Sequence, residues 1–255
     1  MKIAISGKGG VGKSTIAAIL ALTLAERGEK VLALDADPDA NLASALGMPD
    51  ELQDTVVTIS EQLDLIEERM GAKAGTYGQM FTLTPKVDDI AEKYATDFRG
   101  VSLLVLGAAH KGGGGCACPE NAFIKAIIDD LVMEKDETLI MDMEAGVEHL
   151  GRGTAETVDA MLVVVEPGKR SLDCARLIEK MAGEIGIENL FYVGSKVTGD
   201  DDEAYLRDAL GDRLVACLPY STEIRDADRA GKSPYDCMDA VWKERIGQIL
   251  AALGA

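Results

Sequence analysis

Residues 7–14 read Gly7-Lys8-Gly9-Gly10-Val11-Gly12-Lys13-Ser14, and this stretch fits the phosphate-binding pattern G-x-x-x-x-G-K-[ST]. An apolar run at 2–6 precedes it and an Ala/Leu/Ile-rich run at 15–27 follows it, so the loop joins a predicted strand to a predicted helix. In such a loop, backbone N–H groups wrap the phosphates, the lysine reaches the β- and γ-phosphates, and the hydroxyl binds Mg²⁺. We therefore expect a nucleoside triphosphate to contact Gly9, Gly10, Val11, Gly12, Lys13, Ser14 and Thr15.

Short apolar runs recur along the rest of the chain, which is typical of strands buried on both faces of a sheet. Including the first, they occupy residues 2–6, 31–34, 103–106, 138–141, 161–165, 190–193 and 214–218. Helical patterns separate most of them, at 15–27, 121–133, 171–185, 203–210 and 238–253. This alternation predicts an α/β fold with a mainly parallel central sheet and helices on both faces. Because no linker or low-complexity tract divides the sequence, we expect residues 1–255 to form one P-loop NTPase domain.

The charge balance and the cysteine count restrict the surroundings of the protein. The chain has 255 residues, and its 26 Lys and Arg against 44 Asp and Glu give a net charge of −18. This excess of negative charge opposes approach to nucleic acid or to an anionic membrane, so neither is expected as a partner. The longest apolar run, residues 16–25, is much shorter than the about 18 residues of a membrane-spanning helix. With no leader pattern and an odd number of cysteines, five, we expect a cytoplasmic location.

Carboxylates follow two of the predicted strands directly. Asp35, Asp37 and Asp39 come after the run at 31–34, and Asp142 comes after the run at 138–141. Because the carboxyl ends of parallel strands meet at one edge of a sheet, these acids are expected beside the phosphates, around Mg²⁺ or an attacking water. The alternative is that the acids begin a turn or cap a helix, and it applies most strongly to Asp39.

A glycine-rich stretch, Gly112 to Pro119, contains the thiols of Cys116 and Cys118. In an extended segment, side chains at i and i+2 project to the same side, so both thiols can face one metal ion. Two thiolates are half of the four ligands that Zn²⁺ or a square-planar Ni²⁺ requires. Two chains meeting about a two-fold axis would supply all four, and the glycines would let the backbones approach closely. A local redox pair or an inert loop remains the alternative.

Lys8 extends the phosphate-binding pattern to Lys-Gly-Gly-x-Gly-Lys-Ser-Thr, which resembles the deviant P-loop of the MinD/ParA/nitrogenase-iron-protein class of dimeric ATPases. This resemblance implies ATP as the substrate and a catalytic set of Lys8, Lys13 and Asp37. Lys8 would reach the phosphates of the partner chain and Asp37 would orient the attacking water, whereas a solvated loop lysine is the alternative for Lys8. The resemblance implies Mg²⁺ binding by Ser14, Asp35, Asp37 and Asp142. It places Asp39, Asn41, Glu144 and Gly146 in the switch segments.

Two further stretches resemble the adenine-binding loops of the same class. Ser195 and Lys196 stand where relatives often carry Asn-Lys, and the serine weakens the inference of base specificity. Pro219, Tyr220 and Ser221 stand in the second loop, where much of the contact comes from backbone.

The combination of Lys8, the Cys-x-Cys pair and the stretch 142–153, Asp-Met-Glu-Ala-Gly-Val-Glu-His-Leu-Gly-Arg-Gly, resembles the CooC family of nickel-insertion ATPases of carbon monoxide dehydrogenase. The resemblance implies a homodimer, induced by ATP or metal, that binds Ni²⁺, with Zn²⁺ as a possible substitute, through Cys116 and Cys118. The recipient would be apo carbon monoxide dehydrogenase. The alternatives are a maturation ATPase for another nickel or iron–sulfur enzyme such as acetyl-CoA synthase, and a MinD/ParA-like switch without metal cargo. A nitrogenase iron protein is disfavoured because residues 143–153 contain no cysteine.

Overall fold

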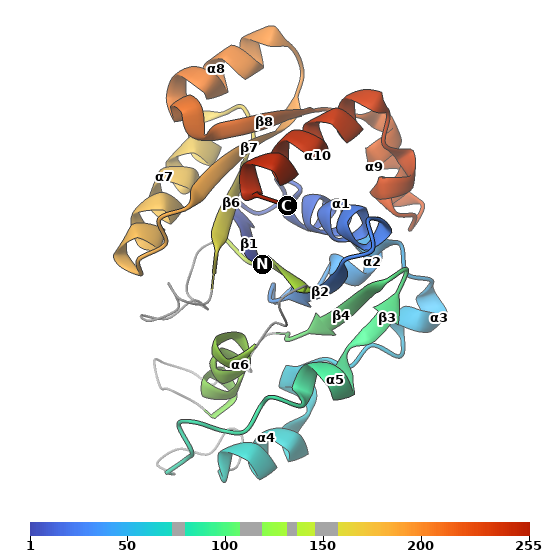
Figure 1. Ribbon diagram of the computed structural model, residues 1–255, viewed down its shortest axis with the longest axis vertical. Helices are drawn as coiled ribbons and strands as arrows, with labels where there is room; N and C mark the ends of the chain where they lie inside the picture. Colours follow the sequence, from blue (N-terminus) through green and yellow to red (C-terminus); the bar gives the residue numbers. More distant parts are fainter. Residues whose placement is uncertain (73–79, 108–118, 132–136, 146–157) are drawn as a thin grey trace.

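The computed structural model describes residues 1–72, 80–107, 119–131, 137–145 and 158–255. The strands in these ranges form one sheet, in the order β3-β4-β2-β5-β1-β6-β7-β8 (Figure 1). All neighbouring strands are parallel except β3 and β4. The predicted mainly parallel α/β fold is confirmed. The strands are β1 (Lys2–Gly7), β2 (Lys30–Asp35), β3 (Thr96–Phe98), β4 (Val101–Val105), β5 (Glu137–Asp142), β6 (Ala160–Val165), β7 (Leu190–Val197) and β8 (Leu214–Pro219).

Helices cover both faces of the sheet, and each face has its own hydrophobic core. On one face pack α1, α2 and α10, with buried residues such as Ile19, Leu46 and Ile249. On the other face pack α4, α6, α7 and α8, with buried residues such as Phe123 and Leu206. The helices are α1 (Lys13–Glu26), α2 (Leu42–Leu46), α3 (Asp50–Gln53), α4 (Leu63–Met70), α5 (Ile90–Tyr94), α6 (Pro119–Asp130), α7 (Lys169–Glu184), α8 (Asp200–Leu210), α9 (Thr222–Arg229) and α10 (Ala240–Leu253).

The elements at the centre of the sheet are those with the strongest sequence patterns. Every residue of β6 is buried, as expected for a strand covered by helices on both faces. Helix α1 lies between the sheet and α2 and α10, and its alanines and leucines are buried around most of its circumference. The predictions for residues 2–6 and 15–27 are therefore confirmed to within two residues at each end.

The sequence analysis missed several short elements, including α2 and α3, and two of them, β3 and α9, show why: both lie where the periodic signal is weak. Strand β3 has only three residues, Thr-Asp-Phe, and pairs antiparallel at the edge of the sheet. Helix α9 is polar on most of its surface and buries only Ile224 and Ala227. Helix α8 begins at Asp200 rather than Glu203, because the acidic run forms its first turn, where carboxylates interact favourably with the helix dipole.

The described residues of 49–72 and 80–100, in which the sequence shows no functional motif, build the part of the molecule around β3 and β4. Figure 1 shows α4 and α5 gathered there with α6, away from α8, α9 and α10. Arg69 on α4 and Asp89 beside α5 are joined by two hydrogen bonds, of 3.1 and 2.8 Å, and Lys93 adds a third to Asp89 at 2.6 Å. These cations hold the pKa of Asp89 well below its usual range. No helix in the described ranges has the length and apolar character needed to cross a membrane.

Candidate functional site

The phosphate-loop sequence lies between β1 and α1, at the carboxyl end of the central strand. Gly10 and Gly12 have φ angles of 80° and 98°, which residues with a β-carbon rarely adopt. Gly12 stands immediately before the first turn of α1, so the free N–H groups of that turn face the loop. This geometry suits an anion, because backbone donors and the positive end of the helix dipole converge there.

Two aspartates lie side by side beneath the loop. Asp35 ends β2 and Asp142 ends β5, and the two residues are paired in the register of these adjacent strands. Both are completely buried. Asp35 accepts hydrogen bonds from the backbone N–H groups of Leu42, at 2.9 Å, and Asp37, at 3.2 Å. Asp142 has no hydrogen-bond partner for either carboxylate oxygen among the described residues.

Burial raises the pKa of both carboxyl groups. The pKa of Asp35 rises to about 6, because loss of hydration outweighs its backbone hydrogen bonds. The pKa of Asp142 rises to about 7, because loss of hydration outweighs the opposing influence of the nearby Ser14 hydroxyl and Lys13 ammonium. A buried carboxylate without a partner is costly unless a cation compensates it. Carboxylate and hydroxyl oxygens are the ligands that Mg²⁺ prefers, so the residues present fit this ion.

The side chains of Lys13, at the end of the phosphate loop, and Asp37, just after β2, lie close to each other. Their Nζ and Oδ2 atoms are 4.0 Å apart, with Lys13 7% and Asp37 17% exposed. The other Asp37 oxygen accepts a hydrogen bond from the backbone N–H of Asp39 at 3.0 Å. Asp39 and Asn41 are exposed, and so is Lys8 within the loop itself. The structure therefore brings Lys13, Asp35, Asp37 and Asp142 together and leaves Asp39 at the periphery.

A cavity of about 340 Å³ adjoins the phosphate loop. All five residues of the two predicted adenine-binding loops line it, together with Gly10, Gly12 and Thr15. The cavity is also lined by residues that were not predicted as nucleotide contacts, namely Ile16, Ile224, Arg225, Asp228 and Trp242. Most of these belong to α9, which was not predicted, or to α10, which is distant in sequence. The size of the cavity and its contact with the loop suit the nucleoside part of a nucleotide.

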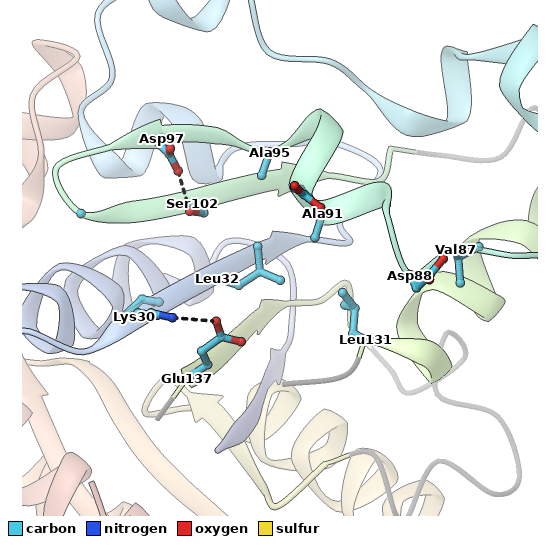
Figure 2. Close-up of a pocket in the computed structure, with 13 residues that line it drawn as sticks. Lys30, Leu32, Val87, Asp88, Ala91, Ala95, Asp97, Ser102, Leu131 and Glu137 are labelled. Carbon is cyan, nitrogen blue, oxygen red and sulfur yellow. Dashed lines mark hydrogen bonds and ion pairs between the residues drawn. The ribbon is translucent and has the colours of Figure 1, made fainter. Parts of the chain in front are cut away.

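A larger cavity, of about 670 Å³, lies at the opposite ends of the strands, where β2 and β5 begin (Figure 2). Its apolar wall includes Leu32, Val87 and Leu131. Two of its charged groups pair with each other, with Lys30 Nζ 3.7 Å from Glu137 Oε1, and Asp97 accepts a hydrogen bond from the Ser102 hydroxyl. No residue pattern in the sequence indicates this cavity.

Several predicted residues lie outside the described ranges or at their edge. Cys116, Cys118 and Gly146 are outside them. Glu144 is described and exposed, and its backbone carbonyl accepts a hydrogen bond from the Ser6 hydroxyl at 3.1 Å. Cys174, Cys217 and Cys237 are free thiols that pack against the two cores, as expected. Within the described residues, no group of three or more His, Cys, Asp or Glu side chains has the arrangement of a metal site.

The phosphate loop and most of the residues that line the 340 Å³ cavity, which we call the base cavity, lie in a region that matches a known family. Residues 2–235 match the CobQ/CobB/MinD/ParA nucleotide binding domain. The chain belongs to this family. Membership makes this MinD/ParA-type protein a nucleotide-binding ATPase, which confirms the activity implied by the resemblance of its phosphate loop.

Individual relatives agree with this assignment along the whole chain. The chain is 42% identical over 254 residues to the carbon monoxide dehydrogenase accessory protein CooC of Rhodospirillum rubrum, covering 99% of this chain and 96% of that protein. It is 43% identical over 235 residues to an uncharacterized ATP-binding protein of Methanocaldococcus jannaschii, covering 91% of this chain and 90% of the relative.

Solved structures support the same fold at much lower sequence identity. A ParA family ATPase from Chlorobium tepidum superimposes with a TM-score of 0.71 at 16% identity, covering 100% of this chain and 99% of that one. The MinC:MinD cell division protein complex of Aquifex aeolicus gives a TM-score of 0.70 at 20% identity, covering 100% and 96%.

Proposed function

We propose that this chain is an ATP-dependent metallochaperone that binds Ni²⁺ between two copies of itself and inserts it into the active-site cluster of carbon monoxide dehydrogenase. The observation that carries the proposal is the end-to-end similarity to the accessory protein CooC. The Cys116-x-Cys118 pair supports it, because two pairs related by a two-fold axis would give four thiolates. The nickel ion is the cargo, and the ATPase is the device that controls its binding and release.

The nucleotide site supports the ATP-dependent half of the proposal. ATP would lie with its phosphates on the loop, its base in the 340 Å³ cavity and Lys13 against the β- and γ-phosphates. Ser14 and the carboxylates of Asp35 and Asp142 would hold Mg²⁺, which neutralises phosphate charge when bound. Asp37, beside Lys13, would orient a water toward the γ-phosphorus. The water oxygen would form a bond to phosphorus as the bond between phosphorus and the ADP oxygen breaks, which releases ADP and phosphate.

Lys8 would act on the partner chain. Its exposure on the loop leaves the ammonium free to cross a dimer interface, where it would stabilise charge on the transferred phosphoryl group. A Lys8→Ala variant is expected to keep ATP affinity within about threefold while hydrolysis falls at least about 100-fold. Mixing this variant with a Lys13→Ala variant tests the crossing directly. The mixed dimer should regain hydrolysis at one of its two sites, and failure to do so would contradict the role in trans.

The metal site is tested by equilibrium dialysis against Ni²⁺ and Zn²⁺, with the dimer fraction measured by sedimentation. We expect one metal ion per two chains in the wild type, coupled to dimer formation, and loss of both in Cys116→Ser/Cys118→Ser. Cys237→Ser is the matched control, because that thiol packs against a core and should not affect metal binding. Unchanged metal binding in the double variant would contradict the metallochaperone and favour a MinD/ParA-like switch without metal cargo.

The identity of the recipient needs a separate measurement. Transfer of Ni²⁺ from the loaded dimer to purified apo carbon monoxide dehydrogenase should restore its activity in the presence of ATP. Activation of apo acetyl-CoA synthase instead would favour the alternative, a maturation ATPase for a related nickel enzyme. An iron–sulfur cluster on the cysteines, detected by its visible absorption, would favour an iron–sulfur carrier.

A further inference from the structure

Lys196 has an unusual backbone conformation at the edge of the base cavity. Its φ angle is 56°, and among the non-glycine residues described only Arg99 also has a positive φ. The pairing of β7 with β8 changes register between Gly194 and Val197, so the strand bulges at this point. A bulge directs a side chain away from the orientation that regular pleating would give. Such disfavoured geometry persists where surrounding contacts hold it, and it is often found at functional sites.

The redirected ammonium group of Lys196 makes two short contacts. Its Nζ donates a hydrogen bond to the backbone carbonyl of Gly10 at 2.6 Å and lies 2.6 Å from Glu166 Oε1. Glu166 follows β6 directly, and its backbone N–H donates to the hydroxyl of the buried Ser171 at 3.0 Å, which anchors it. One ammonium group therefore joins the phosphate loop, the end of β6 and the bulge of β7.

The contact with Gly10 fixes part of the loop that has no side chain to hold it. Because the peptide bond is planar and trans, the direction of the Gly10 carbonyl sets the direction of the Val11 N–H. That N–H is one of the expected phosphate donors, and within the loop it makes only a long bond, 3.4 Å, to the Lys8 carbonyl. Glycine at position 10, with φ 80°, is otherwise free to rotate.

We propose that Lys196 is a positioning residue for the phosphate loop, and that its ammonium group orients the Gly10–Val11 peptide for binding of the triphosphate. This goes beyond the adenine contact implied by the family resemblance, because Lys196 lines the 340 Å³ cavity and its ammonium group is also engaged with the phosphate loop. The proposal rests on the proposed binding of ATP by this loop.

The test compares MgATP with magnesium tripolyphosphate, which has the phosphates but no base. Lys196→Met keeps the stem and removes the ammonium, so binding of both compounds, measured by calorimetry, should weaken by about tenfold. Lys196→Arg should recover part of the affinity for both. Lys180→Met, which removes an exposed lysine paired with Glu184 on α7, is the matched control and should change neither. Thermal unfolding of the four proteins should agree closely, because exposed ion pairs contribute little stability.

The outcomes separate this inference from the proposed function. If Lys196→Met weakens ATP alone, Lys196 is a base contact and the inference is wrong. A wild type that binds ATP but not tripolyphosphate would also overturn the inference. If Lys196 orients the loop, the loop should bind a triphosphate that carries no base. If wild type and variant bind both compounds equally well, the inference fails while the ATP site stands. If the wild type binds neither compound, the proposed function itself fails.

Discussion

The two ends of the central sheet carry cavities of different size and different chemistry. At the carboxyl ends of β2 and β5, Asp35 and Asp142 are buried, and Asp142 has no hydrogen-bond partner in the described residues. At the amino ends of the same strands, Lys30 and Glu137 are paired and more exposed. The cavity at the amino ends is the larger, about 670 against 340 Å³, yet the family's nucleotide-binding loop lies at the other end. Buried carboxylates whose loss of hydration is only partly compensated, rather than cavity volume, identify the site.

The largest effect is expected from Asp142→Asn, which removes the charge and keeps the shape. ATP hydrolysis should fall at least about 100-fold, because the carboxylate proposed to hold Mg²⁺ is lost. The nucleotide-free protein should become more stable, by about 1–3 kcal/mol at pH 8, because a buried charge whose loss of hydration outweighs the contributions of Ser14 and Lys13 is gone. ATPase assays and urea unfolding measure the two effects.

Glu137→Gln is the matched control, because Glu137 stands at the other end of the same strand. This variant should keep full ATPase activity and weaken a half-exposed ion pair with Lys30. An active Asp142→Asn enzyme, or an equally impaired Glu137→Gln enzyme, would remove the distinction between the two ends.

The pH dependence of stability sharpens the same comparison. Asp142 has a folded pKa of about 7 against 3.8 when unperturbed, so between these values the native state binds more protons than the unfolded state. The free energy of unfolding contributed by this group therefore decreases as the pH rises from about 4 to 7. Asp35, with a pKa of about 6, acts in the same direction. The free energy of unfolding, measured in urea without nucleotide or Mg²⁺, should be little higher for Asp142→Asn than for the wild type at pH 4. The difference should be largest at pH 8. A gain that is the same at every pH would contradict burial of charge as its cause.

The carboxyl end of the sheet could largely be predicted from sequence, because its signals are local. The phosphate loop has a fixed spacing, and Asp35 and Asp142 directly follow apolar runs that form β2 and β5. That these two acids are neighbours depends on the strand order, in which β5 lies between β1 and β2. Sequence patterns indicate a parallel sheet but not this order.

The features that sequence could not predict depend on packing between distant segments. The clamp of Lys196 on Gly10 joins residues 186 positions apart and requires a bulge that no residue pattern marks. The cavity at the amino ends is lined by residues of both α5 and β2, and no residue pattern predicts that these two elements lie together. The metal-binding role of Cys116 and Cys118 stays a prediction.

The smallest effect is expected from filling the larger cavity with Ala91→Leu. Ala91 lies on α5 and lines this cavity, where a longer side chain can extend over Leu32 (Figure 2). Stability should change by no more than about 1 kcal/mol, since added apolar contact and minor overpacking nearly offset each other. ATP affinity and hydrolysis should not change.

Ser195→Leu, which places the same side chain in the smaller cavity, should weaken ATP binding at least about tenfold, because Ser195 is nearly buried beside Gly12. If Ala91→Leu instead lowered hydrolysis, the amino ends would be coupled to the nucleotide site through β2, and the two ends could no longer be treated as independent.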